Sequence, residues 1–233
     1  MNHFRNRHEG APFLILGGGV SINDYTVDEL KGGGDRIIIG VNQIARKMDP
    51  DYVTLVDPPL SLMKQAGLGA PRHSLESSQC FVSNEWHSKW RSMSVNVRHA
   101  YPLETFWWYL KELSRHWADY EPTDYATLRY DWWDKCPKIR LPHAPTSVGM
   151  AVLLAIYMGA SKVGILGLDY TLGYFWNPRK VFAKTKHGLK QSRGQWERFR
   201  LLAQHTFDVD IVNLSKWSRI TTLPYFTFEE FYG

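Results

Sequence analysis

Small and short polar residues recur directly after the apolar runs of this chain, where they could bind the phosphates or ribose of a nucleotide. Glycine lets a backbone approach a ligand closely, and hydroxyl and amide groups donate hydrogen bonds to phosphate and ribose oxygens. The first N–H groups of a helix bind anions in the same way. The candidate nucleotide-binding residues are Gly17, Gly18, Gly19, Ser21, Asn42, Asp57, Thr146, Ser147 and Asp169.

The most prominent of these groups is the glycine turn that follows the apolar run Phe13–Leu16. At the end of a first parallel strand, a turn of this kind is where nucleotide phosphates usually lie. A glycine run is a weak motif, and a plain tight turn explains it equally well. Asn42 and Ser21 strengthen the nucleotide interpretation, because their short polar groups would flank the same turn.

Two other candidates have a structural interpretation beside the functional one. Asp169 follows an apolar run and is either a ligand contact or a cap that organises its loop, and the second role is slightly favoured. Thr146 or Ser147 is the expected N-cap of an apolar helix from Val148 to Met158. Capping is compatible with a helix start that also faces a ligand.

The elements that must position these residues form an α/β pattern. Short, continuous apolar runs separated by helices indicate a mainly parallel, Rossmann-like sheet with helices on both faces, which binds ligands at the carboxyl ends of its strands. Thr26 and Glu29 predict a capping box at the start of a short helix. The expected strands are 13–16, 37–41, 51–56, 79–82, a weaker 95–97, 162–168 and 209–213, and the expected helices include 104–117, 148–158, 195–207 and 227–232.

The chain of 233 residues is expected to form a single α/β nucleotide-binding domain over 1–233, with 83–140 as an insertion or lid. Seven of the ten tryptophans lie between residues 60 and 140. These aromatic residues either pack within the protein or grip a second substrate by stacking on a sugar or base. The segment 171–193 is polar and basic, and its composition predicts a mobile loop.

Composition narrows the class of protein. Hydrophobic residues make up 44% of the chain, and no apolar run reaches the roughly 18–20 residues of a membrane-spanning helix. A polar N-terminus and only two cysteines, without a C-x-x-C pair, favour a cytoplasmic protein. The net charge of +5 suits a phosphate-bearing substrate, and also nucleic acid or a membrane surface. The sequence leaves the oligomeric state open, and a homo-oligomer is compatible with it.

The order and spacing of several blocks resemble a group that joins sialyltransferases of glycosyltransferase family 42 with archaeal 6-hydroxymethylpterin pyrophosphokinases and many bacterial and phage relatives. The blocks cover both ends of the chain and leave the middle unmatched. They are the glycine turn, the Asn-Gln strand exit, the Thr-Ser-Gly helix start, the G-x-D exit and the tail, at Leu16–Ile22, Gly40–Gln43, Pro145–Gly149, Gly167–Tyr170, and Ile211–Ser215 with Phe228–Glu230.

This resemblance implies a nucleotide-sugar-dependent glycosyltransferase, with a cytidine-based donor and an acceptor that is a glycan, a small molecule or a modified base. His187 would then be the general base that deprotonates the acceptor hydroxyl, since it lies in the region of the corresponding histidine. A histidine titrates near neutral pH and suits that task. Tyr170 and Tyr174 would stabilise the leaving phosphate. His187 could equally be an exposed histidine among lysines, and Tyr174 an ordinary packing residue.

Two departures from the group keep other functions open. The turn has Gly18 where the group has asparagine, so a phosphate contact there would come from backbone N–H groups. Asp57 stands where the sialyltransferases have asparagine and the pyrophosphokinases have aspartate, which would imply Mg²⁺ as a cofactor for an ATP-dependent phosphotransferase. The third hypothesis is a non-catalytic protein that binds nucleic acid by charge and stacking. The chain has no P-loop, G-x-S-x-G or H-E-x-x-H motif.

Overall fold

The computed structural model describes residues 4–34, 36–55, 79–82, 106–107, 146–171, 173–177 and 186–233. Strands and helices alternate along these residues, and the predicted Rossmann-like α/β class is confirmed. The strands are β1 (Pro12–Leu16), β2 (Ile37–Val41), β3 (Tyr52–Leu55), β4 (Gln79–Val82), β5 (Phe106–Trp107), β6 (Lys162–Leu166) and β7 (Asp210–Asn213). The helices are η2 (Val20–Asp24), α1 (Val27–Lys31), η3 (Gly32–Gly34), η4 (Asn42–Arg46), α7 (Ser147–Tyr157), α8 (Lys186–Phe207) and α9 (Phe228–Tyr232).

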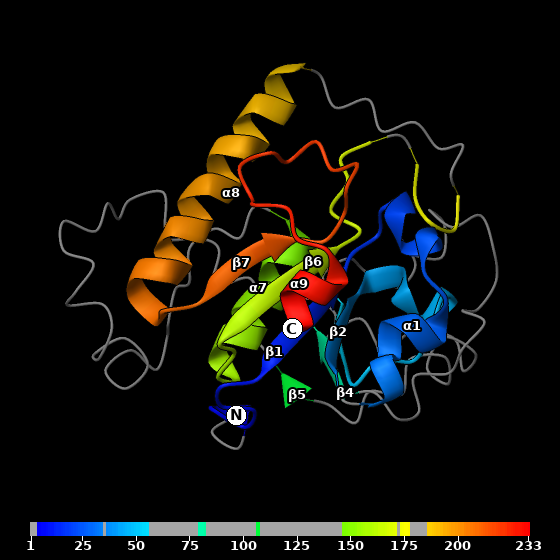
Figure 1. The fold of residues 1–233 in the computed structure, drawn as a ribbon, viewed down its shortest axis with the longest axis vertical. Helices are drawn as coiled ribbons and strands as arrows, with labels where there is room; N and C mark the ends of the chain where they lie inside the picture. The colour runs from blue at the N-terminus through cyan, green and yellow to red at the C-terminus, as the bar shows by residue number, and fades with distance from the viewer. Residues whose placement is uncertain are drawn as a thin grey trace.

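All neighbouring strands of the sheet run parallel, in the order β5-β4-β3-β2-β1-β6-β7. The first five strands are therefore added in one direction from β1, and the last two are added in the other direction. The order reverses between β1 and β6, and such a switch point leaves a crevice at the carboxyl ends of the two strands. In Figure 1 the N-terminus lies at the bottom, near the start of β1, and the segments that follow β1 and β6 lie toward the top.

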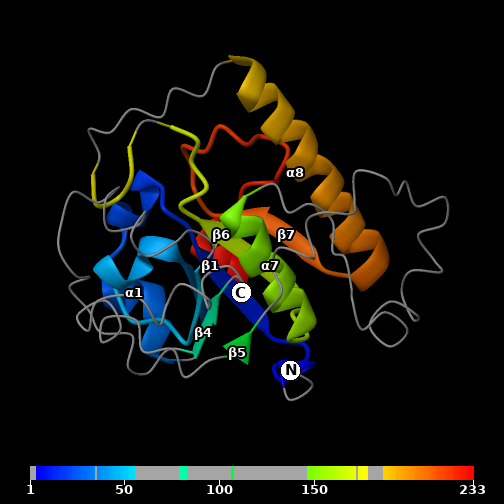
Figure 2. The ribbon, with the colours of Figure 1, turned by 180° about the vertical axis from the view of Figure 1, so that it is seen from behind.

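Each strand buries alternate residues on opposite faces of the sheet. Phe13 and Ile15 of β1 join the apolar core under α7 and α8, whereas Leu14 and Leu16 join the core under α1 and α9. This is the period of two that a strand imposes on its side chains. Figure 1 shows α9 in front of the sheet, and Figure 2 shows α7 in front from behind. Both faces are therefore covered, as continuous apolar strands require.

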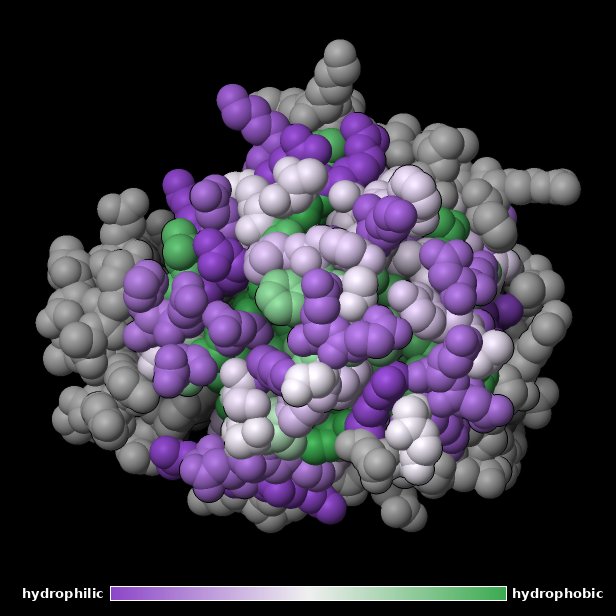
Figure 3. All heavy atoms as spheres, viewed as in Figure 1, coloured by the Kyte–Doolittle hydropathy of each residue, from purple (hydrophilic) through white to green (hydrophobic). Residues whose placement is uncertain are grey.

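On the face that carries α9, the described surface is mostly polar, and apolar side chains show only in small separated areas (Figure 3). Among the helices that the structure describes, none is long and apolar enough to cross a membrane. The capping box of α1 is confirmed: the Glu29 amide donates to the Thr26 hydroxyl, and the Thr26 amide donates to the Glu29 carboxylate at 2.6 Å.

Two predicted elements are wrong. Helix α8 begins at Lys186, nine residues before the expected start, so the predicted loop 171–193 ends in helix. Its sequence carries two glycines and many charges in these turns, which hid the apolar period that Leu189 and Trp196 continue. Phe106 and Trp107 were expected in a helix and instead form the edge strand β5 beside β4. Most of the predicted insertion 83–140 lies outside the described residues.

The last residue of β7 is paired on its outer side. The Asn213 amide donates to the Pro224 carbonyl at 2.8 Å, and the Phe226 amide donates to the Asn213 carbonyl at 3.0 Å. The segment around Tyr225 therefore forms a short parallel bridge beside β7.

Glycine is needed in this turn because the strand ends pack closely together, and not because the backbone has a positive φ. None of Gly17, Gly18 and Gly19 has a positive φ. A Cβ on Gly17 would lie 2.6 Å from the Gly167 carbonyl oxygen, and one on Gly19 would lie 2.4 Å from an Asp169 carboxylate oxygen. Gly167 itself has φ of 81° and needs glycine for that conformation. The ends of β1 and β6 thus touch through their backbones.

This contact predicts opposite effects for the same substitution at two glycines. Gly17→Ala should lower the free energy of unfolding by about 1–3 kcal/mol, because the methyl group must push the two strand ends apart. Gly194→Ala is the matched control: it lies inside α8 with open space around it, and alanine there should raise stability by about 0.5–1 kcal/mol. Urea denaturation measures both values, and equal effects at the two positions would contradict the packing argument.

Candidate functional site

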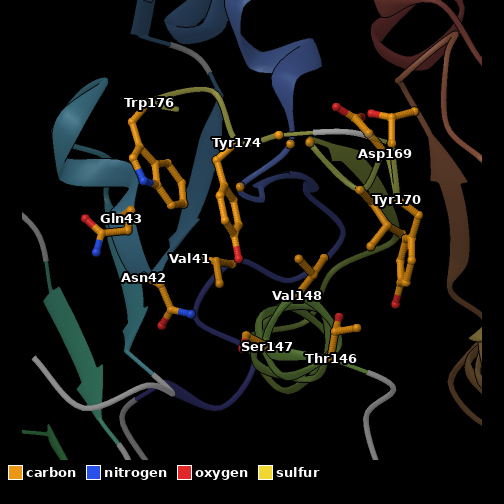
Figure 4. Close-up of a pocket in the computed structure, with 16 residues that line it drawn as sticks. Val41, Asn42, Gln43, Thr146, Ser147, Val148, Asp169, Tyr170, Tyr174 and Trp176 are labelled. Atoms are coloured by element: carbon orange, nitrogen blue, oxygen red, sulfur yellow. The ribbon is translucent and has the colours of Figure 1, made fainter. Parts of the chain in front are cut away.

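A pocket of about 300 Å³ opens at the switch point, where the sheet topology predicts a ligand site. Its wall is built from the exits of β1, β2 and β6, the start of α7, and the segment 171–177, with 172 outside the described residues. Figure 4 shows these groups arranged around one hollow. Side chains from distant parts of the sequence meet there because parallel strands all end at the same edge of the sheet.

The structure brings most of the predicted site residues into this pocket. Those that line it are Gly18, Gly19, Asn42, Thr146, Ser147, Asp169, Tyr170 and Tyr174. Gly17 and Ser21 lie beside the pocket without lining it. The backbone of His187 lies in the first turn of α8, and its side chain and all of Asp57 are outside the described residues. The nucleotide and catalytic roles of these residues stay predictions.

Asp169 is the structural centre of the site. Its side chain is 2% exposed, and one carboxylate oxygen accepts from the Ser21 hydroxyl at 2.6 Å and from the Ser215 hydroxyl at 2.7 Å. The other oxygen accepts from the Ser21 amide at 2.8 Å. Hydrogen bonds to a buried charged group are stronger than those between neutral groups. One carboxylate therefore joins the exits of β1, β6 and β7, which is the organising role that the sequence favoured.

Ser21 uses both its amide and its hydroxyl inside the protein. The hydroxyl that donates to Asp169 also accepts from the Gly167 amide at 3.1 Å. The Gly17 and Gly19 amides donate to the carbonyl groups of Leu166 and Gly167, each at 2.8 Å. Most donors of the glycine turn are thus occupied by the neighbouring strand exit. Gly18 has an amide without a hydrogen bond to the described part of the chain.

The start of α7 supplies donors on another side of the pocket. Thr146 is the N-cap, with extended backbone, and its hydroxyl accepts from the Gly149 amide. The first amides of a helix have no acceptor within the helix, so those of Ser147 and Val148 are available for other partners. The positive end of the helix dipole adds to them. This end of the pocket is therefore suited to an anionic group.

Two residues of the pocket hold an uncommon backbone conformation. Asn42 has φ of 50° and Tyr170 has φ of 52°, and both lie in the left-handed region. Asparagine tolerates this region, but an aromatic residue does so at a cost of about 1–3 kcal/mol. Such strain is found where a fold holds a side chain in a set direction, and Tyr170 packs against the core beside the pocket. Asn6 and Asp208 outside the pocket also have positive φ, so Tyr170, as an aromatic residue, is the outlier that points to the pocket.

The candidate site residues did not include Trp176, Gln43 or Ser215, although Gln43 and Ser215 lie in two of the blocks that carry the family resemblance. Trp176 and Gln43 line the pocket, and Ser215 completes the bonds to Asp169. Trp176 is the third of three consecutive aromatic residues that begin with the candidate Tyr174, and this aromatic run was a usable signal. Ser215 follows the strand 209–213, just as the other candidates follow theirs, so its position after a strand could have found it.

His8 and Tyr52 lie outside the pocket and contact each other. Burial lowers the pKa of His8, whose Nε2 lies 2.7 Å from the Tyr52 hydroxyl oxygen, and burial raises the pKa of Tyr52. The described residues contain no group of three or more His, Cys, Asp or Glu side chains placed to hold a metal ion. In this part of the chain, geometry and packing define the site.

Comparisons with known proteins add evidence on the fold. No protein-family model and no curated protein matches the chain. A solved structure, the MAf glycosyltransferase from Magnetospirillum magneticum AMB-1, matches with a TM-score of 0.54 and 15% sequence identity. The match covers 95% of this chain and 34% of that chain, so this chain spans about a third of that protein's length. At this identity the likeness establishes a shared fold.

The role of Asp169 predicts a large loss of stability when its charge is removed. Asp169→Asn replaces one acceptor oxygen by an amide that faces donor groups of Ser21 or Ser215, so the free energy of unfolding should fall by about 2–4 kcal/mol. Asp208→Asn is the matched control, because this residue is exposed and asparagine suits its φ of 58°. It should change stability by less than about 0.5 kcal/mol. Urea denaturation that gives equal losses would contradict the central role of Asp169.

Proposed function

We propose that the protein is a glycosyltransferase that uses a nucleotide-sugar donor. The observation that carries this proposal is the pocket at the switch point between β1 and β6. The first amides of α7, which have no acceptor within the helix, lie on one wall, and half-buried aromatic rings lie on another. Nucleotides bind at this place in open α/β sheets, with phosphate at a helix N-terminus. The fold that this chain shares with a glycosyltransferase supports sugar transfer as the reaction.

The donor phosphate is proposed to lie at the start of α7. The amides of Ser147 and Val148 and the hydroxyls of Thr146 and Ser147 are the donors there, and the Gly18 amide can add one more. The side chains of Asn42 and Gln43, on the exit of β2, would bind ribose or base. This arrangement needs little from Gly17, Gly19 and Ser21 beyond holding the strand exits in place, because their donors are occupied.

The finer proposal follows the sialyltransferase resemblance. The donor is a CMP-sugar, and the acceptor is a glycan, a small molecule or a modified base. His187 takes the proton of the acceptor hydroxyl, the acceptor oxygen bonds to the anomeric carbon, and the bond from that carbon to the phosphate oxygen breaks. Tyr170 would stabilise the departing phosphate, whereas the Tyr174 ring lies with Trp176 on a different wall from the start of α7.

A thermal-shift screen with CMP, CDP, UDP, GDP and ATP, each with and without Mg²⁺, tests the donor class. CMP should raise the melting temperature without Mg²⁺, since a ligand at 100 times its Kd stabilises the native state by about 2.7 kcal/mol. Cytidine, which lacks the phosphate, is the control and should stabilise the protein less. Stabilisation by ATP only in the presence of Mg²⁺ would instead favour the pyrophosphokinase hypothesis, in which Asp57 binds the metal.

Substitution of His187 tests the catalytic base. His187→Ala should abolish sugar transfer from CMP-sugar donors while the Kd for CMP stays within about threefold, because a base acts on the acceptor rather than on the donor. His205→Ala is the matched control: it lies in the same helix, about 27 Å along the axis from His187 at 1.5 Å per residue. Full turnover in His187→Ala would contradict the role of His187 as general base and would leave the proposed donor site unaffected.

A further inference from the structure

The segment Gly173–Asn177 is fixed to the glycine turn through Phe175. The Phe175 amide donates to the Gly18 carbonyl at 3.1 Å, and its carbonyl accepts from the Asn23 side-chain amide at 2.9 Å. The Phe175 ring is 8% exposed and packs in the core on the α9 face. A segment held by both backbone groups and a buried ring is a built part of the pocket wall.

Phe175 and Trp176 are the two central residues of a tight turn between Tyr174 and Asn177, and of these two Phe175 is the buried one. Tyr174 and Trp176 both line the pocket, and their rings are stacked, with centroids 4.3 Å apart and planes at 16°. The Tyr174 amide donates to the Asn177 carbonyl and the Asn177 amide to the Tyr174 carbonyl, each at 3.0 Å, which closes a tight hairpin around the pair. Two parallel rings are therefore presented together (Figure 4).

The glycine turn leaves room for this ring pair. A Cβ on Gly18 would lie 3.3 Å from a Tyr174 ring carbon and 3.4 Å from two Trp176 ring carbons. Gly18 has neither a positive φ nor the backbone clash that explains Gly17 and Gly19. The missing side chain at this position is thus matched by the aromatic pair that packs over it.

We propose that the Tyr174–Trp176 pair is the wall on which the flat heteroaromatic base of the nucleotide stacks. This inference rests on the proposed function and specifies how its donor is recognised. Both rings line the pocket, so a bound base can lie against the pair from inside it. Parallel, offset stacking of flat rings at such distances is favourable, and one base on an aromatic ring contributes enough to change affinity tenfold or more.

The two ends of the pocket match the two ends of a mononucleotide. Figure 4 shows the ring pair and the start of α7, with Thr146 and Ser147, on different walls of the hollow. The ring pair is apolar and flat, and the helix start offers amides and a positive dipole. A free sugar phosphate would satisfy the helix start alone, whereas a nucleotide engages both walls. Binding energy that depends on the base therefore reports on the ring pair.

The test compares binding of CMP and of ribose 5-phosphate, measured by calorimetry, in four variants whose folding is checked by urea denaturation. Tyr174→Leu and Trp176→Leu keep an apolar side chain and remove a ring, and each should weaken CMP binding about tenfold to a hundredfold. Their affinity for ribose 5-phosphate should stay within about twofold. Tyr174→Phe keeps the ring and should retain CMP affinity within about threefold. Trp217→Leu is the control, since this tryptophan is 66% exposed and does not line the pocket.

Several outcomes would overturn the inference. Unchanged CMP affinity in both leucine variants means that the nucleotide base does not stack on the ring pair. The proposed glycosyltransferase function does not depend on this contact and is unaffected by that result. Equal losses for CMP and ribose 5-phosphate assign the pair to the phosphate end. An equal loss in Tyr174→Phe and Tyr174→Leu assigns the effect to the hydroxyl, and this comparison decides the question even where ribose 5-phosphate binds too weakly to measure.

The proposed function can fail separately. If the wild-type protein binds CMP through the ring pair but transfers no sugar, the stacking wall is supported and the glycosyltransferase proposal is contradicted. Wild-type protein that binds none of the nucleotides in the screen overturns both proposals.

Discussion

The site depends on one buried carboxylate. Asp169 stands at the exit of β6 and binds the turn after β1 through Ser21 and the exit of β7 through Ser215. Without these bonds, three strand ends would leave polar groups buried without partners at the place where the sheet order reverses. The loop after β7 is tied in as well, because the Arg219 amide donates to the Asp169 carbonyl at 2.8 Å. The pocket therefore opens over strand ends that are fixed to one another.

The contact between these strand ends gives the glycine turn a structural role, whereas its sequence suggests a phosphate-binding loop. Two of the three glycines allow the backbones of two strand exits to touch, and most of their donors are used there. A glycine-rich loop after a first strand can thus be selected by the packing of its own fold and still form the floor of a ligand pocket. The nucleotide-binding donors of such a site then come from the neighbouring helix rather than from the loop.

Much of the fold could be predicted because the strands are buried on both faces and read as continuous apolar runs, as in Ile37–Val41. The pocket residues at strand exits could be predicted for the same reason, since parallel topology gathers the residues that follow each strand. The contacts between these residues could not be predicted. Ser215 follows a strand as the other candidates do, but nothing near Asp169 indicates that the two side chains meet, and nothing near Gly18 indicates a contact with Trp176. The early start of α8 was missed because its first turns are too polar to show a helical period. Tertiary packing decides these features, and one sequence does not reveal it.

The short bridge beside β7 has a consequence for how the sheet can grow. An edge strand offers unpaired backbone groups to any other strand. The last residue of β7 already uses its amide and carbonyl groups in hydrogen bonds to the segment around Tyr225. That segment belongs to the same loop that binds the Asp169 carbonyl. Another chain, or an added strand, could pair with this end of the sheet only by displacing the loop, and the switch-point crevice would lose its support. Edge protection and the integrity of the pocket are thus coupled in one short segment.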